Sequence, residues 1–244
     1  MKAIILAAGY ATRLYPLTKD RPKALLPVGG KPIIEYIVDQ MAEMPAITDI
    51  YVVSNHKFFS HFKDWAQSRQ SRQRIIVLDD GTTTEENRLG AIGDIQFAIE
   101  QGAIDDDLII VAGDNLFTFS LADYYAYYKA VDRDCLAAKT LDDIALLRQF
   151  AVAVVDENDK VVSLEEKPAD PQSNIGVYAV YFYKKETVPM FKQYLKEGNK
   201  PDAPGYFAQW LCRQKDVRVY MMPGECYDVG TVRSYELVQR LFGR

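Results

Sequence analysis

The sequence is poor in the side chains that hold transition metals or form disulfide frameworks, with three cysteines and two histidines in 244 residues. Cys135, Cys212 and Cys226 lie far apart and show no C-x-x-C spacing, so neither a zinc site nor a disulfide framework is expected. His56 and His61 lie in a segment whose aromatic residues fall on one helical face, and we expect both imidazoles to face solvent. Chemistry built on a histidine base or ligand is therefore poorly supported.

Long apolar runs are missing as well. No stretch approaches the roughly 20 apolar residues of a membrane-spanning helix. The N-terminus has no basic segment followed by an apolar stretch and a small-residue cleavage site, which is the pattern of a secretory signal. We therefore expect a cytoplasmic protein that has no membrane partner.

Internal repeats, low-complexity segments and Pro/Gly/Ser-rich linkers are also absent from the sequence. A chain of 244 residues with 48% hydrophobic content can bury one substantial core. We therefore predict one domain over residues 1–244.

Positive charge is scarce overall but concentrated near the start. The formal net charge is −5, yet residues 1–31 contain six Lys and Arg against one acidic residue. A local basic patch on an acidic protein favours a small polyanionic ligand, because nucleic acid needs a basic stripe along a whole face. We expect no nucleic-acid partner.

Strand-like apolar runs alternate with helical patterns through the first half. The expected strands cover residues 3–7, 50–54, 75–78 and 108–112, and the expected helices centre on residues 33–44, 58–65 and 92–99. This order predicts an α/β fold with a Rossmann-like, mostly parallel sheet flanked by helices. Ligands of such sheets bind at the carboxyl ends of the strands.

The second half has a different pattern. Residues 150–155 and 161–166 around a polar turn predict a β-hairpin, which we expect to form a sub-region covering the substrate. Further elements are a strand at 175–183, helices at 188–195 and 206–213, a strand at 217–221 and a closing helix at 232–242.

The loop after the first strand carries the most specific motif. It reads Leu6-Ala-Ala-Gly-Tyr-Ala-Thr-Arg-Leu-Tyr-Pro-Leu-Thr18, and Pro22-Lys-Ala-Leu-Leu-Pro-Val28 follows. These residues resemble the signature of the sugar-1-phosphate nucleotidylyltransferases, L-A-A/G-G-x-G-T-R-L-x-P-L-T followed by P-K-x-L-x-P-V/I. Ala11 stands where the family has its second glycine, and its methyl group restricts φ at that position.

The resemblance implies a GT-A-like fold and a Mg²⁺-dependent transfer of a nucleotidyl group from an NTP to a sugar 1-phosphate. By this resemblance, Arg13 and Lys23 are catalytic contacts of the triphosphate. The residues that correspond to nucleotide contacts are Leu6, Ala7, Ala8, Gly9, Thr12, Glu85 and Gly90. Residues 1–115 would then form the nucleotide-binding half, and residues 116–244 the half that binds the sugar phosphate.

Two carboxylates correspond to the family's Mg²⁺ ligands. Asp114 follows a buried strand in Gly-Asp-Asn, and Asp228 lies in Tyr-Asp-Val-Gly-Thr, which resembles the family's W/Y-x-D-x-G-T. Mg²⁺ prefers a few oxygen ligands from the protein and takes the rest from phosphate and water. Without the resemblance, Asp114 is a common turn residue and Asp228 a helix cap.

Two further motifs complete the resemblance. Glu165-Glu-Lys-Pro168 resembles the family's E-E-K-P, in which Lys167 would contact the sugar phosphate and Glu166 the sugar hydroxyls, with Asn174 and Gly176 as further sugar-side candidates. Leu89-Gly-Ala-Ile-Gly-Asp94 resembles L-G-T-A-G-A, where Gly90 would let the backbone approach the nucleobase and Glu85 or Glu86 would read a base or ribose edge.

The sequence leaves several alternative functions open. A Rossmann dehydrogenase would need G-x-G-x-x-G and an acid in place of Asn55, and a GT-A glycosyltransferase would need D-x-D where this chain has Asp114-Asn-Leu116. Transfer to a non-sugar phosphate such as phosphocholine, and a non-catalytic regulatory subunit that binds a nucleotide sugar, both stay open. So do the nucleobase, the sugar and the formation of a homo-oligomer. Acetyl transfer is not expected.

Overall fold

The computed structural model describes residues 1–243, and its centre is a nine-stranded sheet. One side of the sheet is parallel, in the order β5-β4-β1-β6. These strands are β1 (Lys2–Leu6), β4 (Asp49–Ser54), β5 (Arg74–Asp79) and β6 (Leu108–Ala112). Ile4 of β1 lies opposite Tyr51 of β4 and Ile110 of β6. The alternating pattern of the first half therefore predicted this part of the fold correctly.

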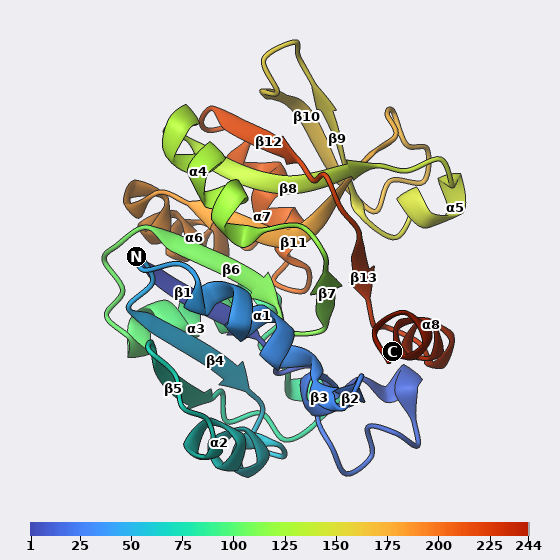
Figure 1. Ribbon diagram of the computed structural model, residues 1–244. Helices are drawn as coiled ribbons and strands as arrows, with labels where there is room; N and C mark the ends of the chain where they lie inside the picture. Colours follow the sequence, from blue (N-terminus) through green and yellow to red (C-terminus); the bar gives the residue numbers. More distant parts are fainter. Residues whose placement is uncertain (244) are drawn as a thin grey trace.

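The second half extends the same sheet through the long strand β11 (Ile175–Tyr183), which pairs antiparallel with β6 (Figure 1). The predicted hairpin is present as β9 (Ala151–Val155) and β10 (Val161–Glu166). The other strands are β8 (Asp134–Thr140), antiparallel to β11, and β12 (Val217–Met221), parallel to β8.

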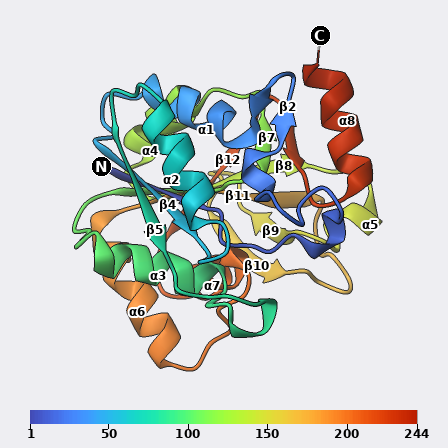
Figure 2. The ribbon, with the colours of Figure 1, turned by 90° about the horizontal axis from the view of Figure 1, so that it is seen from below.

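Helices cover both faces of the sheet (Figure 2). On one face lie α1 (Ile33–Ala42), α2 (Phe59–Ser68) and α4 (Leu121–Val131), which pack with the sheet residues that include Ile5. On the other lie α3 (Ala91–Gln101), α6 (Val188–Lys196) and α7 (Pro204–Leu211), which pack with the set that includes Ile4. Neighbouring residues of β1 therefore enter different cores, as the period of two in a strand requires.

A third, smaller core lies beside the carboxyl ends of β1 and β6. Its buried side chains are Leu14, Leu26, Val28, Ile33, Leu116, Val229 and Val238. They lie in or beside short elements at the molecular edge, namely the 3₁₀ turn Thr12–Leu14, β2 (Pro27–Val28), the start of α1, β7 (Asn115–Phe117), β13 (Cys226–Asp228) and α8 (Val232–Phe242). Strand β3 (Lys31–Pro32) pairs with β2. This core fixes the N-terminal motif against the C-terminal motif.

Short turns complete the chain. They are α5 (Ile144–Leu147) and the 3₁₀ turns Thr12–Leu14, Lys23–Leu25, Glu85–Asn87 and Lys185–Thr187. Both histidines are exposed, as predicted. Within residues 1–243, no helix has the length and apolarity needed to cross a lipid bilayer.

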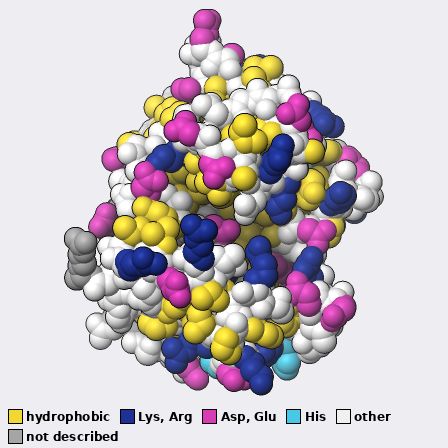
Figure 3. Space-filling model, turned by 90° about the vertical axis from the view of Figure 1, so that its right-hand side faces the viewer, with side chains coloured by type: hydrophobic (Ala, Val, Ile, Leu, Met, Phe, Trp, Pro, Cys, Tyr) yellow, Lys and Arg dark blue, Asp and Glu magenta, His cyan; other side chains and the backbone are white. Residues whose placement is uncertain are grey.

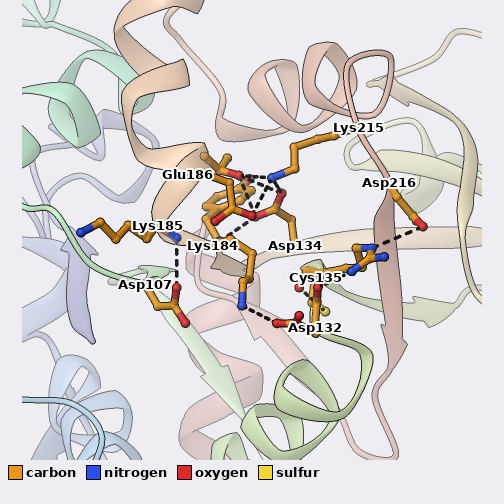
Figure 4. Close-up of polar contacts among 12 residues, drawn as sticks. Asp107, Asp132, Asp134, Cys135, Lys184, Lys185, Glu186, Lys215 and Asp216 are labelled. Atoms are coloured by element: carbon orange, nitrogen blue, oxygen red, sulfur yellow. Dashed lines mark hydrogen bonds and ion pairs between the residues drawn. The ribbon is translucent and has the colours of Figure 1, made fainter.

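A buried ion pair joins three segments of the second half (Figure 4). The Asp134 side chain is fully buried, and its carboxylate lies 2.9 Å from Lys215 Nζ and accepts hydrogen bonds from Lys184 N and Thr187 Oγ1 at 2.7 and 2.9 Å. Burial raises the pKa of Asp134, while the Lys184 amide and Lys215 oppose the rise. Every oxygen is satisfied, as a buried carboxylate requires.

Candidate functional site

The candidate site lies where β1 and β6 end. Two backbone hydrogen bonds close this edge, from Gly113 N to Leu6 O at 2.8 Å and from Ala7 N to Val53 O at 2.9 Å. Figure 3 shows the face that carries α8, which is hollowed near its middle and has Lys and Arg side chains gathered around the hollow. An ideal Cβ on Gly9 would meet nothing within 4 Å, so the backbone of the loop is open there.

Buried side chains hold the loop after β1 in place. Asn55 is fully buried, and its Nδ2 donates to Ala8 O at 2.8 Å while its Oδ1 accepts from Phe58 N at 3.1 Å. The Tyr10 hydroxyl lies 3.2 Å from Thr82 Oγ1. The loop is therefore fixed without a ligand. One signal in the sequence marks Asn55, since it is a polar residue that directly follows a buried strand.

Ala11 has a left-handed backbone, with φ 50° and ψ 41°. Its carbonyl accepts hydrogen bonds from Leu14 N at 3.0 Å and from Thr18 Oγ1 at 2.7 Å. Only glycine adopts this conformation without a steric cost. The loop therefore has a backbone conformation typical of glycine at this position although the residue is alanine.

Asp114 and Asp228 meet through a short two-stranded ribbon. Strand β7 pairs antiparallel with β13, which sets Asp228 opposite Asn115, and Val229 N donates to Asp114 O at 3.2 Å. Residues more than 100 positions apart in sequence thus form one acidic pair at the edge of the sheet.

Lys23 neutralises this pair. Its Nζ donates a hydrogen bond to Asp114 Oδ2 and lies 4.0 Å from Asp228 Oδ1. Burial favours the neutral amine, but the two carboxylates outweigh that effect and raise the pKa of Lys23, which therefore stays charged. Although 48% of the Asp228 side chain is exposed, surrounding protein and the repulsion from Asp114 raise the pKa of Asp228 to about 6.

Arg13 adds a second cation to the cluster. It lies in the 3₁₀ turn Thr12–Leu14, is exposed, and its Nη2 lies 3.6 Å from the place that a Cβ on Gly230 would take. The structure thus brings Arg13, Lys23, Asp114 and Asp228 together.

The donor set suits a hard divalent cation. Two carboxylates face one position from separate segments, and a lysine ammonium is already attracted there. Within residues 1–243, no third His, Cys, Asp or Glu joins the pair to make a larger ligand group. That leaves room for phosphate and water oxygens, which Mg²⁺ prefers to a complete protein cage. The residues therefore fit Mg²⁺ and do not resemble a zinc site.

Glu166 and Lys167 lie at the end of β10. The Glu166 side chain is only 6% exposed, and burial raises the pKa of its carboxyl, while Lys167 Nζ at 3.8 Å opposes the rise. Lys167 has a left-handed backbone with φ 52°, donates from its N to Phe150 O at 3.0 Å, and keeps half of its side chain exposed. A left-handed conformation costs energy in a residue that has a Cβ, so the surrounding structure must enforce it at Lys167.

Asn174 and Gly176 lie farther along the same half. Asn174 is exposed and lines a hollow of about 330 Å³ between α5 and the loop before β11. A Cβ on Gly176 would come within 2.6 Å of Leu141 Cδ1, the end of a flexible side chain, so a larger residue there requires only that Leu141 move. Their sugar contacts stay predictions.

Gly90 also has protein neighbours. Its φ is 79°, and a Cβ would lie 2.7 Å from Pro201 O. Glu85 is half-buried and pairs with Arg88. The described contacts do not join either residue to the acidic pair, and their nucleotide contacts stay predictions.

One acidic pair, Asp80 and Asp94, was not predicted from the sequence. Asp94, in the first turn of α3, is 7% exposed, and burial with the neighbouring Asp80 carboxyl raises the pKa of Asp94 to about 8. Asp94 Oδ1 and Asp80 Oδ2 have no hydrogen-bond partner among residues 1–243. The sequence contains one signal for the pair, since Asp94 stands where the motif L-G-T-A-G-A ends in alanine, and an acid there replaces a small apolar residue.

Comparisons with known proteins agree with these motifs. A family model described as nucleotidyl transferase matches residues 2–242. A putative mannose-1-phosphate guanyltransferase of Sulfolobus acidocaldarius is 31% identical over 96% of this chain and 61% of its own. A glucose-1-phosphate thymidylyltransferase of Neisseria meningitidis is 31% identical over 84% of this chain and 67% of its own.

The fold is shared with solved structures. A putative glucose-1-phosphate thymidylyltransferase from Bacillus anthracis, solved with sucrose, superposes with a TM-score of 0.84 at 24% identity, covering 100% of this chain and 95% of its own. Among the curated relatives, several are much longer, and the chain spans 61%, 53% and 39% of the length of three of them.

Proposed function

Because the chain belongs to the nucleotidyl transferase family, we propose that it is a sugar-1-phosphate nucleotidylyltransferase. In this reaction a phosphate oxygen of the sugar 1-phosphate attacks the α-phosphorus of an NTP. The bond from that phosphorus to the bridging oxygen breaks, and pyrophosphate leaves. The observation that carries the proposal is the acidic pair, Asp114 and Asp228, held around Lys23 beside Arg13.

The cations of the site fit the charge of a triphosphate. Lys23 stays protonated at neutral pH because its pKa is raised, and it would donate to a phosphate oxygen. Arg13, exposed at the rim, would stabilise the charge that develops on the departing pyrophosphate. No protein nucleophile is needed, because the acceptor phosphate is already an anion.

The acidic pair would hold Mg²⁺ together with phosphate oxygens. When bound, the ion supplies neutralisation of the triphosphate and of the in-line transition state. The two carboxylates repel one another in the free protein, which is why the pKa of Asp228 is raised. A bound cation relieves that repulsion.

The acceptor would meet Lys167 and Glu166. Lys167 projects from a strand end with half of its side chain exposed, which suits a contact with the sugar phosphate. The neighbouring Glu166 carboxylate would accept hydrogen bonds from sugar hydroxyls. As in the resemblance, Asn174 and Gly176 are the further sugar-side candidates, and residues 6–9, Thr12, Glu85 and Gly90 those for the nucleotide.

The experiment is a matrix of pyrophosphate release. Five triphosphates (dTTP, UTP, CTP, GTP and ATP) are each paired with glucose, mannose and N-acetylhexosamine 1-phosphates and with phosphocholine. We expect release with one or a few sugar 1-phosphates and its loss in EDTA. Release with phosphocholine alone favours the non-sugar acceptor, and silence in every pair favours the regulatory subunit.

Two variants test the assignment of residues. Asp114→Asn keeps the shape but removes charge from the acidic pair, and we expect turnover to fall by about two orders of magnitude or more. Lys192→Met, at an exposed ion pair on α6, is the matched control and should keep wild-type turnover. Near-normal turnover of Asp114→Asn contradicts the metal assignment.

A further inference from the structure

Residues 201–209 contact both of the proposed subsites. We call them the bridging segment, which comprises residues 201–203 and the first six residues of α7. The segment lies between a motif of the nucleotide half, at Gly90, and a motif of the acceptor half, at Glu166.

The first contact is with the start of α3. Ile92 N donates to Pro201 O at 2.8 Å, and Ala91 N donates to Asp202 O at 3.3 Å, so the bridging segment caps the helix with its own carbonyls. Gly90 packs so closely on Pro201 O that a Cβ has no space. The start of α3 therefore cannot move toward the bridging segment without displacing it.

A side-chain contact strengthens this junction. Arg88 Nη2 lies 3.0 Å from Asp202 Oδ1, while Arg88 Nη1 pairs with Glu85. One guanidinium thus ties the bridging segment to the loop 85–90 that the family motif assigns to the nucleotide. A shift of Glu85 toward a bound base or ribose therefore moves the same guanidinium that is paired with Asp202.

The second contact is with the proposed acceptor residue. Gln209 Oε1 accepts a hydrogen bond from Glu166 N at 2.9 Å. The Glu166 carboxylate occupies the space that a Cβ on Gly205 would need. The bridging segment therefore holds Glu166 at both its backbone and its carboxylate.

The middle of the bridging segment is anchored in the core. Phe207 is fully buried and stacks on Phe191 with ring centroids 3.7 Å apart. A helical turn that is anchored at its centre and packed at both ends moves as one body, because close-packed side chains leave little space for internal adjustment.

We propose that the bridging segment positions Glu166 according to the position of loop 85–90, so that nucleotide binding prepares the acceptor subsite. The inference rests on the proposed function, because it takes loop 85–90 as a nucleotide contact and Glu166 as an acceptor contact. Gln209 and Gly205 are positioning residues, since they act on the acceptor through Glu166.

The first test needs no substrate. Amide hydrogen exchange of Glu166 is measured in the ligand-free wild type, in Gly90→Ala and in Asp202→Asn. Gly90→Ala pushes on Pro201 O, and we expect it to speed exchange at Glu166 by about tenfold, the effect of weakening one hydrogen bond. Asp202→Asn loses an exposed ion pair, keeps the fold, and should speed exchange at Glu166 by about two- to fivefold.

The second test uses turnover. Gln209→Leu should raise the KM for the sugar 1-phosphate by about tenfold, because Glu166 N loses its acceptor, with the KM for NTP unchanged. Gln193→Leu, on α6, is the control, since the one side-chain hydrogen bond of Gln193 within residues 1–243 goes to Glu197. Adding the cognate NTP alone should slow exchange at Glu166 in the wild type and do so less in Asp202→Asn.

The outcomes separate the two proposals. If no substrate pair releases pyrophosphate, the proposed function fails, while the exchange of ligand-free Glu166 still decides whether the two motifs are coupled. If Gly90→Ala and Asp202→Asn alter exchange at residues 88–92 but leave Glu166 unchanged, the coupling is overturned. An equal rise of both KM values in Gln209→Leu also contradicts it.

Discussion

Replacing Ala11 by glycine should stabilise the protein. Ala11 has φ 50° and ψ 41°, a conformation that costs a residue with a Cβ about 1–2 kcal/mol. Glycine avoids that cost but loses about 0.5–1 kcal/mol more conformational entropy on folding than alanine does. The midpoints of these two ranges differ by about 0.75 kcal/mol, so Ala11→Gly should increase the free energy of unfolding by roughly that amount.

The expected change is measurable by thermal and urea unfolding. For a domain of this size, 1 kcal/mol corresponds to a shift in Tm of about 2–4 °C, so Ala11→Gly should raise Tm by about 1–4 °C. The urea m-value should not change, because the variant removes one methyl group from a partly exposed loop.

The control is the same substitution at an ordinary helical position. Ala126 is exposed in the middle of α4, where glycine should lower the free energy of unfolding by about 1 kcal/mol. Opposite signs for Ala11→Gly and Ala126→Gly are the result that the geometry requires. A loss of stability in both variants would refute the left-handed conformation of the loop.

Three further substitutions test charges whose cost or benefit depends on pH. The folded-state pKa of Asp228 is raised from its ordinary value of 3.8 to about 6, so ionisation of this carboxyl costs stability, and the cost grows between about pH 4 and pH 6. Asp228→Asn should therefore abolish turnover yet raise Tm at pH 7.5, and the gain in Tm should shrink below pH 6 and vanish only near about pH 4. The pKa of Asp94 is raised to about 8, so the wild-type free energy of unfolding should fall by on the order of 1 kcal/mol per pH unit as the pH rises from 5 to 8. Urea titrations should show that Asp94→Asn lacks this dependence on pH. Lys215→Met leaves the buried Asp134 carboxylate without its cation, so it should lower the free energy of unfolding by about 3–5 kcal/mol at pH 8 and by less at pH 5. The control, Lys192→Met at an exposed ion pair, should change the free energy of unfolding by under about 0.5 kcal/mol.

Periodic segments were predictable because one physical signal determined each of them. The strand at 175–183 and the helix at 232–242 have the bounds that were expected from alternation and from the helical period. The parallel half followed from the order of strands and helices, since a right-handed crossover leaves few alternatives.

The segment 116–150 was not predictable from pattern. Helix α4 carries four tyrosines, which lie on several sides of the helix. Two of them are fully buried, and Tyr127 donates its hydroxyl proton to Val219 O at 2.9 Å. An almost continuous aromatic face has no helical period. Strand β8 holds Asp134 in the core only because Lys215 and Thr187 satisfy it, and these partners are distant in sequence.

The motif predicts a glycine at position 90 but does not say which structural contact requires it. The resemblance assigned this glycine to the approach of a nucleobase. In the structure, the carbonyl of Pro201 already occupies the space beside its Cα, and the left-handed φ of 79° excludes most other residues. The contact depends on a segment more than 100 residues away, so no local reading of the motif contains it.

The acidic pair is the clearest conflict between stability and the proposed function. Strands β7 and β13 have three residues each, and their pairing holds two carboxylates together although the repulsion raises the pKa of one of them. A third group, the mostly buried Lys23, offsets the repulsion only in part, since Asp228 still titrates near pH 6 by its raised pKa. Local violations of this kind persist where binding restores the balance. The unfavourable charge of the free site therefore supports a cationic ligand more strongly than either carboxylate does alone.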